Sequence, residues 1–215
     1  MLSIIIADDH AIVRSGVRLL LEREPDLRVV DEVATGEAAI QRTVEIQPDV
    51  LVLDLSMPGV SGFEVARQVR VRSRATRIVV LSMHANESYV HEALHSGALA
   101  YVLKEATGNE LVRAIRSVAD GRRFLSTPLS VERLRAYAAL SGPETDDYDR
   151  LTARERQVLQ FVADGHTNVE IGALLSVSAR TVEAHRARLL SKLGLHGQQE
   201  LFRYALRRGL ITLDS

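Results

Sequence analysis

The first half of the chain alternates short apolar runs with segments that have helical periodicity. Five runs predict strands, at residues 2–7, 27–33, 50–53, 77–81 and 100–103. Three of these runs are almost wholly apolar, as is typical of parallel strands that are covered on both faces. Helices are predicted between them, over 11–23, from Thr35, and over 62–72, 87–95 and 109–120. Five βα units with right-handed crossovers predict an α/β fold with a doubly wound parallel sheet.

After Gly121 the alternation stops. One helical piece is predicted at 129–140, and a polar, acidic stretch at 141–149 is typical of a linker. Only helical periodicity remains after that, and capping boxes at Thr152 and Thr167 predict helix starts. We expect four helices, near 153–164, 168–175, 179–193 and 198–208. The predicted organisation is a first domain at 1–121, a linker with one helical segment at 122–150, and a second domain at 151–215.

The formal net charge of −1 conceals an asymmetry between these segments. By count of charged residues it is −4 over 1–121, 0 over 122–150 and +3 over 151–215. This pattern favours a cation-binding module joined to one that binds a polyanion. The absence of cysteine excludes disulfides, Cys-ligated zinc and a Cys nucleophile. The apolar start is too short for a signal peptide or a membrane span, so we expect a soluble, cytoplasmic protein without membrane contacts.

Polar residues stand where the predicted strands end. Asp8 and Asp9 follow the first strand, Asp54 the third, Ser82 the fourth, and Lys104 comes just after the fifth. In an open α/β sheet, loops at the carboxyl ends of the strands form the ligand crevice. The sequence therefore predicts that three carboxylates, a hydroxyl and an ammonium converge at one end of the sheet.

Three carboxylates in one place repel each other, so either their pKa values rise or a divalent cation neutralises them. Oxygen ligands suit Mg²⁺, or Mn²⁺ in its place. A carboxylate can also attack phosphorus while a lysine offsets the charge on the phosphoryl oxygens. Taken singly, each residue has a simpler reading: Asp8 and Asp9 as a helix cap, Asp54 as a turn former, Lys104 as a surface charge. The complete set at successive strand ends favours the shared site.

The same positions resemble a known family. Asp8-Asp9-His10, the stretch 54–62, Leu81-Ser82-Met83-His84 and the stretch 97–104 are similar to receiver domains of NarL/FixJ-class response regulators. The resemblance implies a flavodoxin-like (βα)5 fold with Asp54 as phosphoacceptor. It also implies a metal site of Asp8, Asp9, Asp54 and the backbone carbonyl of Ser56, with Lys104 holding the phosphoryl group. Ser82 and Tyr101 would be the switch pair, the Tyr101 ring moving inward when Asp54 is phosphorylated.

Two alternatives stay open. Haloacid-dehalogenase-like phosphohydrolases also form an aspartyl phosphate, but they use Asp-x-Asp, and Ser56 stands where the second carboxylate would be. Without that general acid and base, the acyl phosphate should persist, so we expect a self-phosphorylating regulator and not a turnover enzyme. The other alternative is a transcription factor whose first domain never accepts phosphate and only dimerises or binds another ligand.

The segment 151–215 resembles the LuxR-type helix-turn-helix, through 151–159, 165–172, 181–185, 192–194 and 205–211. A helix at 168–175, a tight turn at 176–178 and a longer helix from 179 have the spacing of that motif. Val182, Leu189 and Leu193 form the predicted inward stripe of the longer helix. The opposite face predicts DNA contacts from Arg180, Thr181, Glu183, Ala184, Ala187, Arg188 and Lys192. A solvated face of a protein-binding bundle is the other interpretation.

The resemblance also implies partners. A sensor histidine kinase would phosphorylate Asp54, and the last helix would help a homodimer to place two recognition helices on promoter DNA. The sequence-based hypothesis is a population shift, in which phosphorylation favours a conformation that releases the DNA-binding helices, promotes dimers, or does both.

Overall fold

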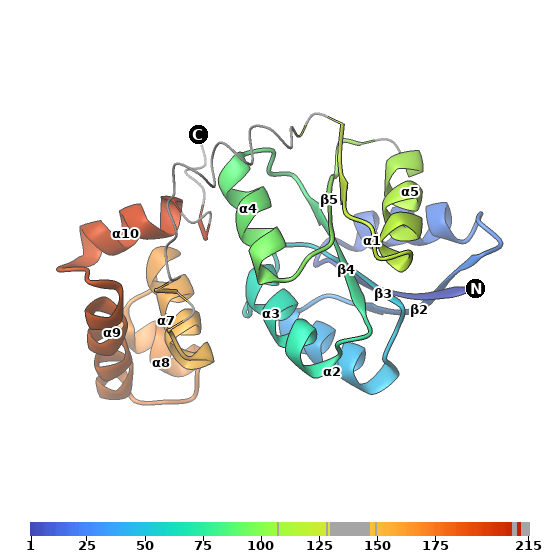
Figure 1. The fold of residues 1–215 in the computed structure, drawn as a ribbon. Coiled ribbons are helices and arrows are strands. Elements are labelled where there is room, and N and C mark those ends of the chain that lie inside the picture. The colour runs from blue at the N-terminus through green and yellow to red at the C-terminus, as the bar shows by residue number, and fades with distance from the viewer. Residues whose placement is uncertain (107, 128, 130–146, 149, 208–209, 212–215) are drawn as a thin grey trace. The chain divides into compact units, whose positions relative to one another are not determined.

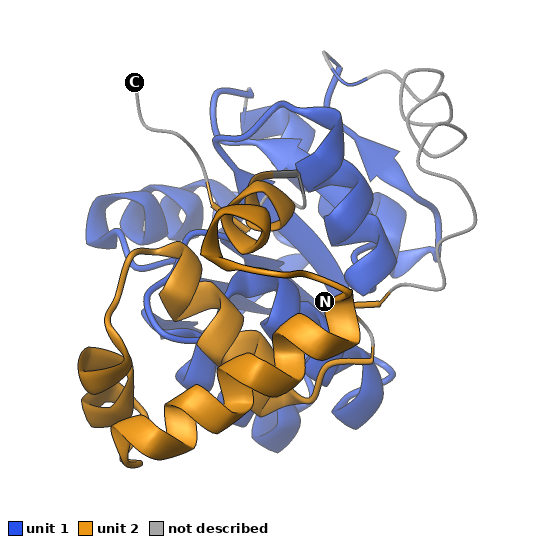
Figure 2. Cartoon of the chain, turned by 90° about the vertical axis from the view of Figure 1, so that its left-hand side faces the viewer, with its two compact units in different colours: residues 1–138 blue, residues 139–215 orange. Residues whose placement is uncertain are grey.

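The computed structural model describes residues 1–106, 108–127, 129, 147–148, 150–207 and 210–211. The chain divides into two compact units, residues 1–138 and 139–215 (Figure 2). Within the described residues, every helix is too short or too polar to cross a membrane. The predicted helix at 129–140 lies outside the described residues, except for Leu129. The domain boundaries at 121 and 150 stay predictions.

The first unit is a parallel sheet between two layers of helices (Figure 1). Its strands follow the order β2-β1-β3-β4-β5-β6 and comprise β1 (Leu2–Ala7), β2 (Leu27–Val33), β3 (Val50–Leu53), β4 (Arg77–Ser82), β5 (Ala100–Leu103) and β6 (Phe124–Leu125). Helices α1 (Ala11–Leu21) and α5 (Gly108–Ala119) cover one face, and α2 (Gly36–Ile46), α3 (Gly62–Arg72) and α4 (Glu87–Ser96) cover the other (Figure 1). The predicted doubly wound α/β fold is confirmed.

The predicted strands agree closely with the observed ones because their apolar runs are buried on both sides. Val50–Leu53 and Ala100–Leu103 are buried at every position. The core under α1 and α5 gathers aliphatic residues from all the central strands, among them Ile4, Ile6, Val52, Val79, Leu81 and Val102. Burial of a large aliphatic side chain contributes about 1.5–3 kcal/mol, so these runs fix the strand positions.

One strand was not predicted. Phe124–Leu125 forms β6, which pairs in parallel with β5 although the sequence analysis placed residues 122 onward in the linker. A two-residue strand is too short to show the alternation that identifies longer strands. The first residues of the predicted linker therefore belong to the sheet.

The register of the sheet places the predicted site residues side by side. Ala7 is the partner of Leu53, so Asp8 and Asp54 are the next residues on adjacent strands. Ser82 is the partner of Leu103, so Lys104 follows directly beside it. Strand order reverses between β1 and β3, and the crevice of an open α/β sheet lies at such a reversal.

The second unit contains four described helices: α7 (Ala153–Ala163), α8 (Asn168–Leu174), α9 (Ala179–Leu193) and α10 (Gln198–Arg207). They enclose a small core that includes Val158, Leu159, Ile171, Val182, Leu189, Leu193 and Leu201. Both predicted capping boxes are present: Thr152 pairs with Glu155, and Thr167 with Glu170. These local signals explain why the predicted starts of α7 and α8 match the observed ones.

Candidate functional site

The carboxylates of Asp8, Asp9 and Asp54 lie together at the carboxyl ends of β1 and β3. We call this cluster the acidic pocket. Asp8 and Asp54 are each 2% exposed, and the Asp9 side chain is 30% exposed. One ligand atom from each of Asp8, Asp9, His10 and Asp54 lies within 4.8 Å of the others. The structure therefore brings together the three carboxylates that the sequence placed at separate strand ends, and it adds His10.

Lys104 closes the pocket from the end of β5. Its Nζ lies 2.8 Å from Asp8 Oδ2 and 2.8 Å from Asp54 Oδ2. Burial opposes the ammonium charge, but the hydrogen bonds to Asp54 and Asp8 outweigh it and raise the pKa of Lys104 above its usual value. Three carboxylates and one ammonium leave two negative charges, which a divalent cation would balance.

The donor set fits Mg²⁺ or Mn²⁺. Carboxylate oxygens are the ligands these hard cations prefer, and the exposed part of Asp9 leaves room for metal-bound water. His10 Nδ1 lies 2.8 Å from Asp9 Oδ1 and 3.3 Å from Asp8 Oδ1, so the imidazole lies beside both carboxylates. Sequence reasoning gave His10 no role, although its position directly after Asp8-Asp9 was a signal.

The loop after Asp54 is fixed by close backbone approach. The backbone N–H of Ser56 donates to Asp54 Oδ1 at 3.2 Å, which places Ser56 beside the carboxylate. A Cβ on Gly62 would lie 2.5 Å from the Asp54 carbonyl oxygen, so only glycine fits where α3 begins. The Ser61 side chain caps α3. The Ser56 carbonyl as a metal ligand stays a prediction.

Ser82 and Tyr101 are linked through His84. The backbone N–H of His84 donates to Ser82 Oγ at 3.2 Å, and the Tyr101 hydroxyl donates to the His84 carbonyl at 2.7 Å. Tyr101 is fully buried, and burial raises its pKa, so the hydroxyl stays protonated. The ring is therefore buried in this structure, and its movement upon phosphorylation stays a prediction. The His84 ring also contacts the Tyr89 ring, with centroids 4.2 Å apart, and neither of these residues was assigned a role from the sequence.

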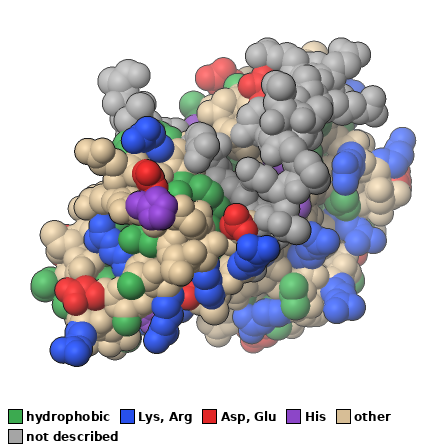
Figure 3. Space-filling model, turned by 60° about the vertical axis from the view of Figure 1, so that its left-hand side comes forward, with side chains coloured by type: hydrophobic (Ala, Val, Ile, Leu, Met, Phe, Trp, Pro, Cys, Tyr) green, Lys and Arg blue, Asp and Glu red, His purple; other side chains and the backbone are tan. Residues whose placement is uncertain are grey.

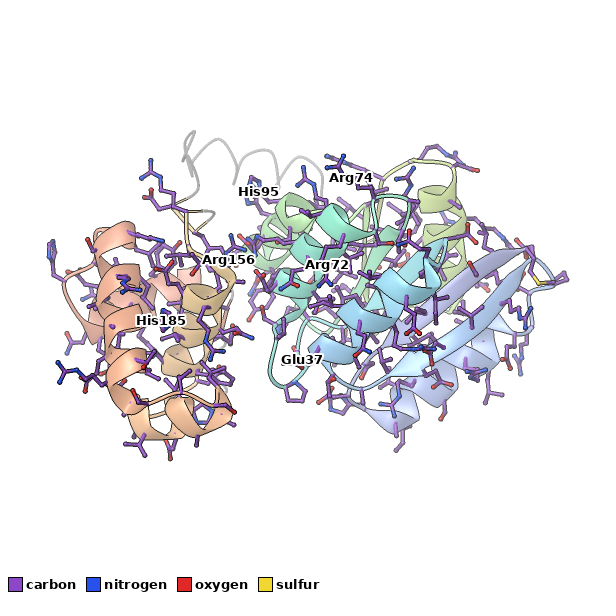
Figure 4. The ribbon with its side chains drawn as sticks, turned by 90° about the horizontal axis from the view of Figure 1, so that it is seen from below. Glu37, Arg72, Arg74, His95, Arg156 and His185 are labelled. Atoms are coloured by element: carbon purple, nitrogen blue, oxygen red, sulfur yellow. The ribbon has the colours of Figure 1, made fainter. Side chains whose placement is uncertain are left out.

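In the second unit, α9 presents a polar face. Its predicted inward stripe of Val182, Leu189 and Leu193 is buried. His185, labelled on α9 in Figure 4, is half-buried beside this stripe. Six of the seven predicted DNA-contact residues are exposed: Arg180, Thr181, Glu183, Ala184, Ala187 and Arg188. Figure 3 shows basic side chains dispersed over the visible surface, not gathered in one block, in agreement with the modest charge of this segment.

The connection between α8 and α9 has helix-turn-helix geometry. A Cβ on Gly172 would lie 2.7 Å from the Val177 carbonyl oxygen, so glycine lets the turn pack directly on α8. The Ser178 side chain accepts from the Thr181 N–H at 3.1 Å and caps α9. Arg154 donates to the Leu175 carbonyl at 2.6 Å, which ties α7 to the same turn. The turn therefore holds α9 at a fixed angle to α8.

Lys192, the seventh predicted DNA contact, is engaged inside its own unit. Its Nζ lies 2.7 Å from Glu155 Oε2 and donates to the Arg150 carbonyl at 3.1 Å. The Glu155 side chain is 3% exposed. Burial would raise the pKa of Glu155, but hydrogen bonds from Lys192 and Thr152 outweigh burial and lower it. Lys192 thus neutralises a buried carboxylate, and we leave it out of the candidate DNA-binding face.

Comparison with known proteins decides the family. The family model for the response regulator receiver domain matches residues 4–116, and the model for bacterial regulatory proteins of the luxR family matches residues 149–205. The chain belongs to the response regulators with a LuxR-type DNA-binding domain. Such proteins are transcription regulators and not conventional enzymes.

A full-length relative and a solved structure support this assignment. The oxygen regulatory protein NreC of Staphylococcus aureus is 38% identical over 215 residues, covering 98% of this chain and 99% of the relative. The crystal structure of a LuxR-family two-component response regulator from Aurantimonas sp. SI85-9A1 is 36% identical, with a TM-score of 0.60 over 64% of this chain and 97% of that one.

A second solved structure includes DNA. RcsB from Salmonella enterica serovar Typhimurium, bound to promoter rprA in the presence of the phosphomimetic BeF3⁻, is 28% identical, with a TM-score of 0.60 over 94% of this chain and 97% of that chain. A further structure, of two RcsB dimers bound to two parallel DNAs, is 29% identical with a TM-score of 0.57 over 94% of this chain and 96% of that one. This response regulator is therefore similar over almost its full length to proteins seen on DNA.

Proposed function

We propose that this response regulator accepts a phosphoryl group on Asp54, with Mg²⁺ or Mn²⁺ bound, and that phosphorylation increases its binding to promoter DNA. The observation that carries the proposal is the acidic pocket, in which three carboxylates face one ammonium. A pocket that retains two negative charges is suited to a divalent cation, and the Lys104 ammonium beside Asp54 would meet a phosphoryl group bound there.

The chemical step is an in-line transfer. An Asp54 carboxylate oxygen forms a bond to phosphorus while the bond from phosphorus to the donor breaks, and the leaving group departs with that electron pair. The donor is a phosphohistidine of a sensor histidine kinase, or acetyl phosphate. The Lys104 ammonium now lies between Asp54 and Asp8. After transfer it would contact a phosphoryl oxygen, which carries the negative charge. The Ser82 hydroxyl would donate to another.

The metal would be held by Asp9, Asp54 and the Ser56 carbonyl, with Asp8 orienting a bound water. When bound, the cation neutralises the phosphoryl oxygens. His10 Nδ1 lies beside both Asp9 and Asp8, at 2.8 and 3.3 Å from one oxygen of each, so the imidazole borders the proposed metal site. Ser56 stands where the phosphohydrolases have a second catalytic carboxylate. The pocket therefore lacks a general base at that position, which favours a persistent acyl phosphate over hydrolysis.

DNA recognition is assigned to the exposed face of α9. Arg180 and Arg188 would contact phosphate or guanine edges, and Glu183 would accept from a cytosine amino group. Ala184 and Ala187 leave space for thymine methyl groups, and Thr181 would contact a phosphate. The RcsB structures show related proteins on DNA, and one contains dimers, so we propose a homodimer on two half-sites in the cytoplasm.

The test uses the full chain and acetyl phosphate. With Mg²⁺, wild type should give one slower-migrating species on a phosphate-affinity gel, whereas Asp54→Ala and EDTA-treated protein should give none. Asp120→Ala, an exposed aspartate at the end of α5, is the matched control and should behave as wild type. Genomic fragments selected by phosphorylated protein should bind more weakly to Asp54→Ala. Absence of the shifted species in wild type would refute the proposal.

A further inference from the structure

The predicted linker, which starts at residue 122, is called the connector below. Its first residues are hydrogen-bonded to β5, the strand that leads into Lys104. Ser126 follows β6, and its N–H donates to the Tyr101 carbonyl at 3.0 Å. Its Oγ accepts from the Leu103 N–H at 3.1 Å. A single serine thus occupies two successive hydrogen-bonding positions on β5, one through its backbone and one through its side chain. Ser126 is fully buried.

A carboxylate from α5 holds this serine in place. Ser126 Oγ donates to Glu110 Oε2 at 2.7 Å. Thr127 donates to the other oxygen, Glu110 Oε1, through both its hydroxyl and its N–H. These hydrogen bonds, from Thr127 first and then Ser126, lower the pKa of Glu110, so the carboxylate stays charged near neutral pH. We call Glu110, Ser126 and Thr127 the connector clasp.

The connector clasp contacts β5 one residue before the site. Leu103, whose N–H the clasp binds, precedes Lys104, and Lys104 N–H donates to the Ser82 carbonyl at 2.9 Å on the opposite side of the strand. The end of β5 is therefore held from both sides, by the clasp and by β4. An amide hydrogen bond in a buried position fixes the backbone because leaving its donor unpaired costs about 1–3 kcal/mol.

We propose that Ser126 and Glu110 are positioning residues, which set where β5 presents Lys104 to the phosphoryl group, and that the connector's attachment and the occupancy of the Asp54 site are therefore coupled. This inference rests on the proposed function. Coupling between two sites is reciprocal: if the clasp favours the phosphoryl-bound pocket, phosphoryl binding must tighten the clasp equally. Because Ser126 and Thr127 come directly after β6, the clasp would pass the state of the pocket to the backbone that follows the sheet.

The experiment compares Ser126→Ala with Ser126→Thr, which keeps the hydroxyl, and with Ser15→Ala, an exposed control on α1. Metal binding is measured alone, by Mn²⁺ titration, and then with beryllofluoride as the phosphoryl mimic. Lys104 is followed directly by ¹³Cε-lysine NMR, because the chain contains only two lysines, Lys104 and Lys192, and Lys192 serves as an internal reference.

We expect Ser126→Ala to weaken beryllofluoride binding about fivefold or more, within the usual range of site-to-site coupling. Mn²⁺ affinity should change less than about twofold, because the proposed metal ligands follow β1 and β3 and not β5. The Lys104 resonance should shift and the Lys192 resonance should not. Ser126→Thr should restore most of the affinity, and Ser15→Ala should match wild type. In wild type, beryllofluoride should slow hydrogen exchange at Leu103 and Ser126.

Several outcomes would overturn the proposal. If Ser126→Ala binds beryllofluoride as wild type does, or loses Mn²⁺ affinity to the same extent, the clasp does not position Lys104. If Ser126→Thr fails to rescue while remaining folded, the hydroxyl is not the relevant group. If wild type itself does not bind beryllofluoride with the metal, the proposed function fails and the clasp's role in it fails too. The wild-type measurement therefore tests the proposed function, and the variants test the positioning role of the clasp.

Discussion

The receiver and the DNA-binding domain contain one lysine each, and the contrast between them separates a candidate ligand site from a structural ion pair. Lys104 and Lys192 each lie within hydrogen-bonding distance of a carboxylate that is at most 3% exposed. Lys104 faces a cluster of three carboxylates, which leaves an excess of negative charge. Lys192 faces a single carboxylate, Glu155, that the Thr152 cap also satisfies. The excess negative charge of a cluster, and not the burial of a single ion pair, therefore indicates a ligand site.

The largest expected effect comes from replacing the receiver lysine. Lys104→Met should slow phosphorylation by acetyl phosphate roughly 100-fold or more, the usual cost of losing one charge-stabilising donor. Mg²⁺ should still bind, because the carboxylates remain. Phosphate-affinity gels over time measure the rate. A rate within about threefold of that of wild type would show that Lys104 does not assist the transfer.

The helical-domain lysine should affect stability and not phosphorylation. Lys192→Met leaves Glu155 without its cation and should destabilise the helical unit by about 2 kcal/mol, less than a fully buried pair because the Lys192 side chain is 35% exposed. Urea unfolding, followed by hydrogen exchange in α7 and α9, measures the loss. The double variant Lys192→Met with Glu155→Met should recover much of it. If Lys192→Met instead keeps full stability and loses DNA affinity, the original DNA-contact prediction was right.

Glu155 also gives the pair a pH signature. Its folded pKa is lowered from 4.5, so its contribution to stability is present above that value and is lost as pH falls through the folded pKa. Hydrogen exchange in α7 should therefore accelerate as pH is lowered below about 4.5, after correction for the intrinsic rate. Glu155→Gln should show a weaker pH dependence over the same interval. Identical profiles would show that Glu155 is not the responsible group.

The smallest expected effect lies on the exposed face of α9. Arg188→Met should leave stability unchanged within about 0.5 kcal/mol, as is usual for surface positions. It should weaken DNA binding and reduce the slope of log affinity against log salt by about one if Arg188 contacts a phosphate. Binding titrations at several salt concentrations, on a fragment selected from the genome, measure the slope. Arg203→Met, an exposed arginine on α10, is the comparison variant.

Local sequence predicted most of the fold. The five longer strands and the capped helices follow from apolar runs and from caps such as Thr152 and Thr167, whose causes lie within a few residues of each other. The acidic pocket could also be predicted, because residues that follow paired strand ends must be neighbours. The two-residue β6 could not, since it is held by hydrogen bonds from Phe124 to Leu99 and from Ser126 to Tyr101 and not by any apolar run of its own.

Periodicity and strand ends were enough to predict the two-domain organisation, the meeting of Asp54 and Lys104 at the end of the sheet, and the buried stripe of α9. Contacts between elements far apart in the sequence decided which partner each long side chain takes. They brought Lys192 to Glu155, buried the Tyr101 ring, and brought Glu110 to Ser126. Flexible side chains take the partner that lowers their free energy most, and that partner is 37 residues away for Lys192, which no local pattern encodes.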